Sequence, residues 1–224
     1  MSIMCGRYTL RTPIDSLVER FEIEEYPSSI TPSFNIAPTQ EVAAVLSEDD
    51  ERHLEMLRWG LIPLWADDSG IGSRMINARS ETAAEKPSFR KAFKERRCLI
   101  LADGFYEWQK TGNGKQPYYI RMEDGSPFAL AGLWEVWDKY GEEIRSCTIL
   151  TTAANDLVGE IHHRMPVILP PENYDVWLDP DMREAEPLRD LLRPYRDEVM
   201  EAYSVSRKVN KPSNDEPSCI EPAA

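Results

Sequence analysis

The sequence predicts an α+β fold in a single domain, mostly antiparallel β-sheet curled into a barrel or sandwich with helices at its periphery. Five strand-like runs follow one another from residue 98 to residue 152, and turn residues typical of hairpins separate them. Helical periodicity is confined to short segments on either side of these runs. The chain has 224 residues, of which 42% are hydrophobic, so one domain can bury a sizeable core. We expect this domain to span residues 5–222.

The N-terminal part of the chain predicts helices around one pair of strands. Thr12 supplies an N-cap and Pro13 a first-turn proline, and apolar residues then follow at helical spacing as far as Phe21. The expected elements are a helix over residues 13–21, a loop over 26–40, paired strands over 41–46 and 53–59 around an acidic turn at 47–50, and a helix within 82–96.

The rest of the chain predicts a meander of hairpins followed by short helices. The expected strands cover residues 98–102, 105–109, 118–122, 128–137 and 144–152, with turns at 103–104, 112–114, 124–125 and 139–141. Helices are expected at 155–161, 171–178 and 187–192, and a last strand at 199–206. The polar, proline-rich stretch 210–224 would by composition be a loose tail.

The charge balance is acidic. Lys and Arg total 26 against 39 Asp and Glu, so the formal net charge is −13. Charge alone therefore argues against a nucleic-acid binder, whose domain is usually basic. The basic residues are 18 Arg and 8 Lys, which fits either adaptation to high salt or an ordinary acidic cytosolic enzyme. No apolar run is long enough to span a membrane and no secretory signal is evident, so we expect a cytoplasmic protein.

The four cysteines lie far apart, at Cys5, Cys98, Cys147 and Cys219, and only three histidines accompany them. This spacing offers no zinc site and favours free thiols over disulfides. Cys98 and Cys147 lie in apolar strand-like runs, where a buried structural thiol is expected. Cys5 differs because it lies almost at the N-terminus.

Polar residues with catalytic chemistry occur in four separate segments. Cys5, Asn77, Glu107 and His162 would supply a nucleophile, an amide, a carboxylate and an imidazole. Each also has an ordinary structural interpretation. Glu107 in a strand is commonly a solvated carboxylate, His162 after a helix commonly stabilises its C-terminus, and Asn77 commonly forms a turn. Composition alone leaves both interpretations open.

Seven blocks of sequence resemble those of the SRAP family, the SOS response-associated peptidase or abasic site processing proteins. The blocks are MCGRYTL (4–10), FNIAPTQ (34–40), RWGLIPLWA (58–66), NARSET (77–82), RRCLILADGFYEWQ (96–109), HHRMPVIL (162–169) and the closing VNKPSNDEPSCIEP. They occur in the family's order and at similar spacing. The resemblance implies an SRAP fold whose C-terminal segment is an ordered part of the domain.

The resemblance also implies a function and a set of site residues. SRAP proteins bind single-stranded DNA and cross-link covalently to abasic (AP) sites during the DNA damage response. The cysteine that forms the link follows the initiator Met in this family and is matched by Cys5, and the active-site Asn, Glu and His match Asn77, Glu107 and His162. No metal or organic cofactor is implied.

The DNA contacts implied by the resemblance are arginines and aromatic residues. The matching residues are Arg7, Arg79, Arg97 and Arg164, with Trp59 and Trp65 placed where the family has apolar or stacking residues. The expected partner is single-stranded DNA containing AP sites, with the replication machinery as a further partner class. We expect a monomer that is cytoplasmic and associates with the nucleoid through DNA.

The chemistry requires Cys5 to be the first residue. An N-terminal cysteine can form a Schiff base with the AP aldehyde through its α-amine and then close a thiazolidine through its thiol. As written, Met1 to Met4 precede Cys5, so either translation starts at Met4 or the protein cleaves itself after Met4. The alternatives are an autoproteolytic cysteine peptidase or other thiol hydrolase, a non-covalent single-stranded DNA binding module, and an AP lyase.

Overall fold

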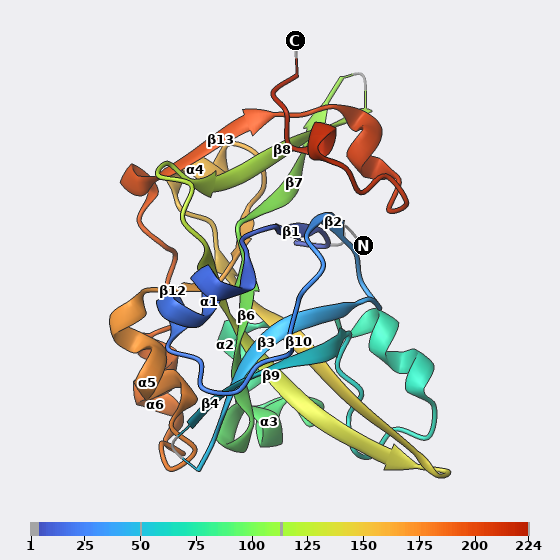
Figure 1. Ribbon diagram of the computed structural model, residues 1–224, viewed down its shortest axis with the longest axis vertical. Helices are drawn as coiled ribbons and strands as arrows, with labels where there is room; N and C mark the ends of the chain where they lie inside the picture. The colour runs from blue at the N-terminus through green and yellow to red at the C-terminus, as the bar shows by residue number, and fades with distance from the viewer. Residues whose placement is uncertain (1–4, 50, 113, 224) are drawn as a thin grey trace.

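The structure is a computed structural model that describes residues 5–49, 51–112 and 114–223. Its strands form two sheets, and the helices lie at the periphery, which confirms the predicted α+β class. In Figure 1 one sheet occupies the upper part of the molecule and the other lies below it. The expected extension Met1 to Met4 and two turn residues, Asp50 and Asn113, lie outside the described residues.

The upper sheet is antiparallel throughout (Figure 1). Its strands, in spatial order, are β13 (Met200–Ser204), β8 (Gly114–Met122), β7 (Gly104–Thr111), β1 (Tyr8–Leu10) and β2 (Ser33–Ile36). The hairpin β7–β8 follows the predicted strands closely. Strand β2 lies within the segment 26–40 that we expected to be a loop, because its four residues obtain their pairing from β1 and show no strand periodicity of their own.

The lower sheet closes into a five-stranded barrel. Its strands, in order around the barrel, are β10 (Glu142–Ala153), β4 (Glu51–Trp59), β3 (Glu41–Glu48), β6 (Arg97–Ala102) and β9 (Phe128–Lys139). Strand β9 pairs with β10 in an antiparallel manner, and a short parallel pairing of β10 with β4 completes the ring. Short strands β5 (Asn77–Arg79) and β11 (Arg164–Pro166) pair with β10, and β12 (Ile168–Leu169) pairs with β9.

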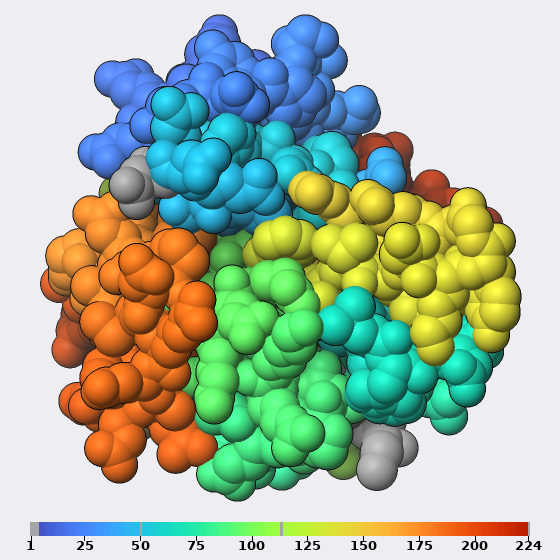
Figure 2. Space-filling model, turned by 90° about the horizontal axis from the view of Figure 1, so that it is seen from below, coloured from blue at the N-terminus to red at the C-terminus, as the bar shows by residue number. Residues whose placement is uncertain are grey.

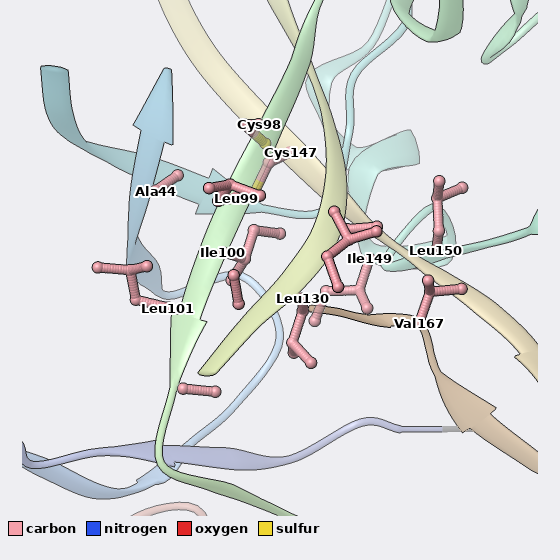
Figure 3. Packing of buried hydrophobic residues seen from close by; sticks show 14 of the residues in the cluster. Ala44, Cys98, Leu99, Ile100, Leu101, Leu130, Cys147, Ile149, Leu150 and Val167 are labelled. Atoms are coloured by element: carbon pink, nitrogen blue, oxygen red, sulfur yellow. The ribbon is translucent and has the colours of Figure 1, made fainter. Parts of the chain in front are cut away.

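Aliphatic side chains and two thiols fill the core of the barrel (Figure 3). Ile100, Leu130 and Ile149 are fully buried, as are the free thiols of Cys98 and Cys147. The prediction that these two cysteines are buried structural thiols is therefore confirmed. Closure removes the free edges of the barrel strands, so this half of the molecule is held by both backbone pairing and apolar burial.

Short helices cover the outside of both sheets. They are α1 (Ile14–Phe21), α2 (Ser80–Ala83), α3 (Arg90–Glu95), α4 (Asp156–Gly159), α5 (Tyr174–Leu178) and α6 (Ala185–Asp190). The 3-10 helices are η1 (Ser69–Arg74), η2 (Pro171–Asn173), η3 (Asp197–Val199), η4 (Arg207–Asn210) and η5 (Pro217–Cys219). Seen from below, the α3 segment (green) lies between the α5–α6 segment (orange) and the β9–β10 hairpin (yellow) (Figure 2).

Several helix predictions need correction. Helix α1 is where the sequence predicts it, but its N-cap is Pro13, and the Thr12 hydroxyl and backbone N–H donate to Asp103 on another element. The helix expected within residues 82–96 is divided into α2 and α3, and the helix expected at 155–161 is a single turn, α4. The C-terminal stretch is ordered up to residue 223, as the resemblance implied and composition did not.

Candidate active site

Strand β7 carries a buried carboxylate on the side that faces the barrel. Side chains alternate along a strand, so Phe105 and Glu107 share one face while Tyr106 and Trp108 share the other. Phe105 belongs to the main core, and Tyr106 packs in a separate cluster with the C-terminal segment. The residue Glu107 is only 2% exposed. The interpretation of Glu107 as a solvated, outward carboxylate is therefore wrong.

Cys5 lies directly against this carboxylate. Strand β1 pairs with β7, with Tyr8 opposite Phe105, and this register brings Cys5, three residues before β1, to Glu107. The backbone N–H of Cys5 donates to Glu107 Oε1 at 2.7 Å. The Cys5 side chain is fully buried, and its backbone has φ 39°, in the left-handed region.

Burial raises the pKa of the Glu107 carboxyl and of the Cys5 thiol. It raises the pKa of Glu107 to about 7, although hydrogen bonds from the Cys5 and Trp108 backbones and the charge of Lys115 act in the opposite direction. Burial, reinforced by the charge of Glu107, raises the pKa of the Cys5 thiol well above its ordinary value. At neutral pH Glu107 can therefore both accept and release a proton, while the thiol is protonated.

Asn77 approaches Cys5 from the barrel. It begins β5, which runs parallel to β10 with Asn77 opposite Ile149. Its side-chain amide donates to the carbonyl oxygen of Cys5 at 3.5 Å. The structure thus joins three of the four predicted catalytic residues, with Cys5 between Glu107 on the upper sheet and Asn77 on the barrel.

Trp59 holds these two halves together from inside the core. Its indole N–H donates to the carbonyl of Ile76 at 2.9 Å, and its ring packs edge-on against Tyr8 with 5.3 Å between centroids. Trp59 is fully buried and offers no face to a DNA base. The structure therefore corrects the expected stacking role of Trp59: this residue positions the segments that carry Asn77 and Cys5.

His162 lies just beyond α4, on the side of β7 that carries Glu107. Gln109, two residues after Glu107 and on the same face, donates to the carbonyl of Glu160 at 2.9 Å and fixes this segment to the strand. Nδ1 of His162 lies 3.2 Å from both the backbone nitrogen and the carbonyl oxygen of Arg164, so it accepts from the N–H in one tautomer and donates to the carbonyl in the other. Within the described parts of the chain, His162 makes no hydrogen bond to Cys5 or Glu107. His162 therefore lies on the same side of β7 as Glu107 but, in the described structure, is not joined to Glu107 or Cys5 by a hydrogen bond.

The pKa of His162 is lowered from its ordinary value. Burial is the main cause, and the neighbouring charges of His163, Lys115 and Lys110 add to it, against a hydrogen bond with Arg164. His163 stacks on His162 with 4.4 Å between ring centroids and is itself exposed. A neutral imidazole can exchange a proton with an oxygen placed in the site.

Arg7 is engaged with the C-terminal segment. Its guanidinium donates to Asn35 Oδ1 at 2.8 Å and to the Val209 carbonyl at 2.7 Å, and it lies over the ring of Trp108. Asn35 is 1% exposed, and its own amide donates to three carbonyls in residues 209–214. Sequence reasoning missed Asn35 and Trp108, although both lie inside the matched blocks.

Arg97 is buried and binds backbone carbonyls inside the protein. It is 4% exposed, and its guanidinium donates to the backbone carbonyls of Trp177, Phe93, Lys94 and Asp179. Burial lowers its pKa to about 10. An arginine committed to four carbonyls cannot reach a DNA phosphate, so the expected DNA contact of Arg97 is corrected to a structural role.

Arg79 and Arg164 lie next to predicted catalytic residues in the chain and differ in their exposure and partners. Arg79 is two residues after Asn77 on β5 and is exposed, and its side chain makes no hydrogen bond or ion pair within residues 5–49, 51–112 and 114–223. Arg164, two residues after His162, is 9% exposed and donates to Glu81 and to the carbonyl of Thr151. Of the four predicted DNA-contact arginines, Arg79 is the one presented to solvent without a partner in the described structure.

Trp65 has an exposed side chain at the protein surface. It is 55% exposed and lines a cavity of about 450 Å³ together with Leu64 and the cations of α3. Its carbonyl accepts from Lys139, which is paired with Glu142 near the end of the β9–β10 hairpin. Ala84, at the end of α2, lines the same cavity. Among the described residues, Trp65 makes no hydrogen bond to Cys5, Asn77 or Glu107.

Two kinds of feature are absent from the part of the chain that the structure describes. The described ranges contain no group of three or more His, Cys, Asp or Glu that could hold a metal ion. In the same part of the chain, none of the helices is long and apolar enough to cross a membrane.

Comparison with known proteins identifies the family. The sequence model described as SOS response associated peptidase (SRAP) matches residues 4–212. This chain belongs to the SRAP family. The protein named abasic site processing protein YoqW of Bacillus subtilis (strain 168) is 46% identical over 222 residues, covering 97% of this SRAP chain and 99% of the relative. The protein named abasic site processing protein HMCES of Gallus gallus is 36% identical and covers 85% of this chain and 66% of the relative.

Solved structures agree with the SRAP assignment. A protein from Bacteroides thetaiotaomicron superposes with a TM-score of 0.87 at 30% identity, covering 98% of this chain and all of that one. A protein from Bordetella bronchiseptica gives a TM-score of 0.77 at 30% identity, covering 90% of this chain and all of that one. The SRAP fold predicted from the seven sequence blocks is therefore confirmed.

Proposed function

We propose that this SRAP protein processes abasic sites in single-stranded DNA by forming a covalent thiazolidine link through Cys5. The observation that carries the proposal is the 2.7 Å hydrogen bond from the Cys5 backbone nitrogen to Glu107, a buried carboxyl with a pKa raised to about 7. Membership of a family whose relatives are named abasic site processing proteins supports the choice of substrate.

The first step uses the nitrogen of Cys5 as an α-amine. The ring-opened AP site presents an aldehyde at C1′, which the amine attacks to give a carbinolamine, and loss of water then gives an imine. An α-amine has a pKa of roughly 7.7–8.0, so part of it is unprotonated near neutral pH. Glu107 accepts the proton that the nitrogen releases and returns it to the departing hydroxyl. The proton balance of this step thus needs one carboxyl group.

The second step uses the sulfur of the same residue. The thiol adds to the imine carbon, forming the C–S bond, and its proton is transferred to the imine nitrogen. The product is a five-membered thiazolidine with no change in oxidation state. Because the Cys5 thiol is protonated in its buried site, it enters after the amine has reacted. Asn77 holds the Cys5 carbonyl and so limits rotation of the nucleophile.

His162 completes the proposed site as a proton donor. Its imidazole donates a proton to the sugar oxygen that is released when the AP ring opens. Arg79 is the cation available to an adjacent phosphate, because it is exposed on the same strand as Asn77. The domain that performs this function would span residues 5–222, with residues 1–4 absent from the active form.

A denaturing gel tests the proposal. Protein mixed with AP-containing single-stranded DNA is expected to give a heat-stable shifted band that Cys5→Ala abolishes and that undamaged DNA does not give. Cys5→Ser separates the two steps, because it retains the amine and closes the ring poorly, so its link should be labile to heat. Intact mass of the active species should show Cys5 as the first residue.

The alternatives predict other results. A shifted band that survives Cys5→Ala would point to another nucleophile, and a cross-linking species that still carries residues 1–4 would overturn the thiazolidine mechanism. Cleavage of the DNA without a stable link would indicate an AP lyase. Binding without any covalent band would leave a non-covalent DNA-binding module, and peptide cleavage without cross-linking would leave a thiol peptidase.

A further inference from the structure

A carboxylate lies between the two arginines that flank the catalytic residues. Glu81, in the first turn of α2, accepts from both terminal nitrogens of Arg164, one of these bonds at 2.9 Å. Arg79 is two residues before Glu81 in the chain. The hydrogen bond from Arg164 lowers the pKa of Glu81, and the charges of Arg164 and Arg79 add to this effect. Glu81 is therefore ionised at neutral pH.

The two partners of this ion pair are exposed to different degrees. The Glu81 side chain is 51% exposed, whereas that of Arg164 is 11% exposed. The carboxylate thus lies on the solvent side of the guanidinium and covers it. On the inner side Arg164 donates to the carbonyl of Thr151 at 2.6 Å. If Glu81 left, Arg164 would keep this anchor and would present two N–H donors to solvent.

A phosphodiester can take the place of such a carboxylate. Both anions accept two parallel hydrogen bonds from a guanidinium, and their geometries are similar. An ion pair with a half-exposed partner contributes little net stability, so it opens readily when another anion competes. Arg79 lies nearby, is exposed and has no partner among the described residues, so it can neutralise the same phosphate or the next one.

We propose that Glu81 is a specificity-determining residue that occupies the phosphate-binding face of Arg164 until a DNA phosphate displaces it. The inference rests on the proposed function, because that function supplies the DNA. Because Glu81 must be displaced from Arg164 first, the reversible affinity is reduced equally for every DNA strand, with or without a lesion. A strand with an AP site is then retained by the bond to Cys5, whereas an undamaged strand dissociates. Weak reversible binding thereby favours the lesion.

Reversible binding tests this role separately from the covalent step. All variants carry Cys5→Ala, and fluorescence anisotropy measures the Kd for a labelled, undamaged single strand at several salt concentrations. Glu81→Gln, which keeps the shape and removes the charge, is expected to lower Kd about three- to tenfold. The plot of log affinity against log salt should become steeper by up to about 0.7, the value for one phosphate contact on a single strand.

Three further variants complete the design. Glu81→Ser also removes the charge and serves if Glu81→Gln does not fold. Glu81→Asp retains the charge and should leave Kd within about twofold. Glu85→Gln is the matched control, because it breaks a comparable exposed ion pair, Glu85 with Arg189 at 2.8 Å, in the same part of the chain. It should leave Kd unchanged.

Each outcome decides the inference. An unchanged or higher Kd in Glu81→Gln and Glu81→Ser overturns the inference. Glu81 would then only hold Arg164 in position. A gain that persists when Arg164→Gln is added overturns it too, because the effect then does not act through Arg164. Absence of strand binding by every variant overturns both this inference and the proposed function. Unchanged Kd in the Cys5→Ala background, together with normal cross-linking by Glu81→Gln in a protein that retains Cys5, overturns this inference alone.

Discussion

The barrel and the upper sheet hold the two sides of the site by different means. The barrel is closed by backbone pairing and filled by aliphatic side chains, with Ile100 and Ile149 fully buried. The upper sheet has its outer face covered by the C-terminal segment, which is attached largely through polar contacts. Asn35 donates to three carbonyls of that segment, and Asp215 accepts from Ser33 and Phe34 of β2.

This difference assigns separate roles to the two halves. Asn77 extends a barrel strand and shares the rigidity of the apolar core. Cys5 and Glu107 belong to the upper sheet, whose covering layer depends on a few hydrogen bonds. We therefore expect changes in the barrel to reduce global stability, and changes in the upper sheet to act on the geometry and ionisation of the site.

The largest expected effect is in the barrel. Ile100→Ala removes a fully buried side chain from β6 and should lower the free energy of unfolding by about 3–4 kcal/mol. Chemical denaturation measures this. The matched control is Met56→Ala on β4, where the side chain is 39% exposed, and its effect should be less than about 1 kcal/mol. Equal losses for the two variants would show that the barrel core does not dominate stability.

The next effect concerns the ionisation of Glu107. Its pKa in the folded protein is raised to about 7 from 4.5, so the folded state holds the proton more tightly than the unfolded state. The stabilisation is complete below pH 4.5 and is lost as pH rises through about 7. Relative to the parent that retains Met4, Glu107→Gln should therefore be about equally stable at pH 4.5 and about 3 kcal/mol more stable at pH 8. A difference that does not change with pH would contradict this assignment.

The third effect concerns the cover of the upper sheet. Asn35→Ala leaves three carbonyls of residues 209–214 and the guanidinium of Arg7 without this partner, which should cost about 2 kcal/mol. Hydrogen exchange should accelerate in residues 205–222 and much less in the barrel strands. Asn173→Ala, at a position without such bonds to the segment, is the control. Uniform acceleration across both sheets would mean that the two halves unfold together.

The smallest effect on stability is expected at Arg79. Arg79→Gln removes an exposed charge without a partner in the described chain and should change unfolding by less than about 0.5 kcal/mol. It should weaken binding of single-stranded DNA and reduce the salt slope by about 0.7. Arg193→Gln, which removes an exposed cation paired with Asp190, should affect neither quantity. If Arg79→Gln kept the parent protein's slope of log affinity against log salt, this result would exclude Arg79 as a phosphate contact.

Local patterns were sufficient to predict much of the fold. Turn residues and alternating strands located the hairpins β7–β8 and β9–β10, and helical spacing located α1. A barrel or sandwich was expected, but the strands that close the barrel were not predictable in this way, because closure depends on a parallel pairing of Ser146 and Cys147 with Arg58 and Trp59. These residues are far apart in the sequence, and no local signal marks which strands will meet.

The site was predictable as a set of residues and not as a geometry. The resemblance selected Cys5, Asn77 and Glu107, which the structure joins by hydrogen bonds. It could not separate Arg79 from Arg97, because both are arginines in matched blocks. The difference arises from tertiary packing, since the carbonyls of Trp177 and Asp179 at the end of α5 surround Arg97 and nothing comparable covers Arg79.

The left-handed backbone of Cys5 would give the proposed removal of residues 1–4 an energetic consequence. A φ of 39° is unfavourable for a residue with a Cβ, by about 1–2 kcal/mol. This torsion is defined only while a carbonyl carbon precedes the Cys5 nitrogen. Once Cys5 is the terminal residue the torsion no longer exists, and the conformational penalty disappears with it. The free amine would therefore rest beside Glu107 without the strain that the longer chain carries at the same place.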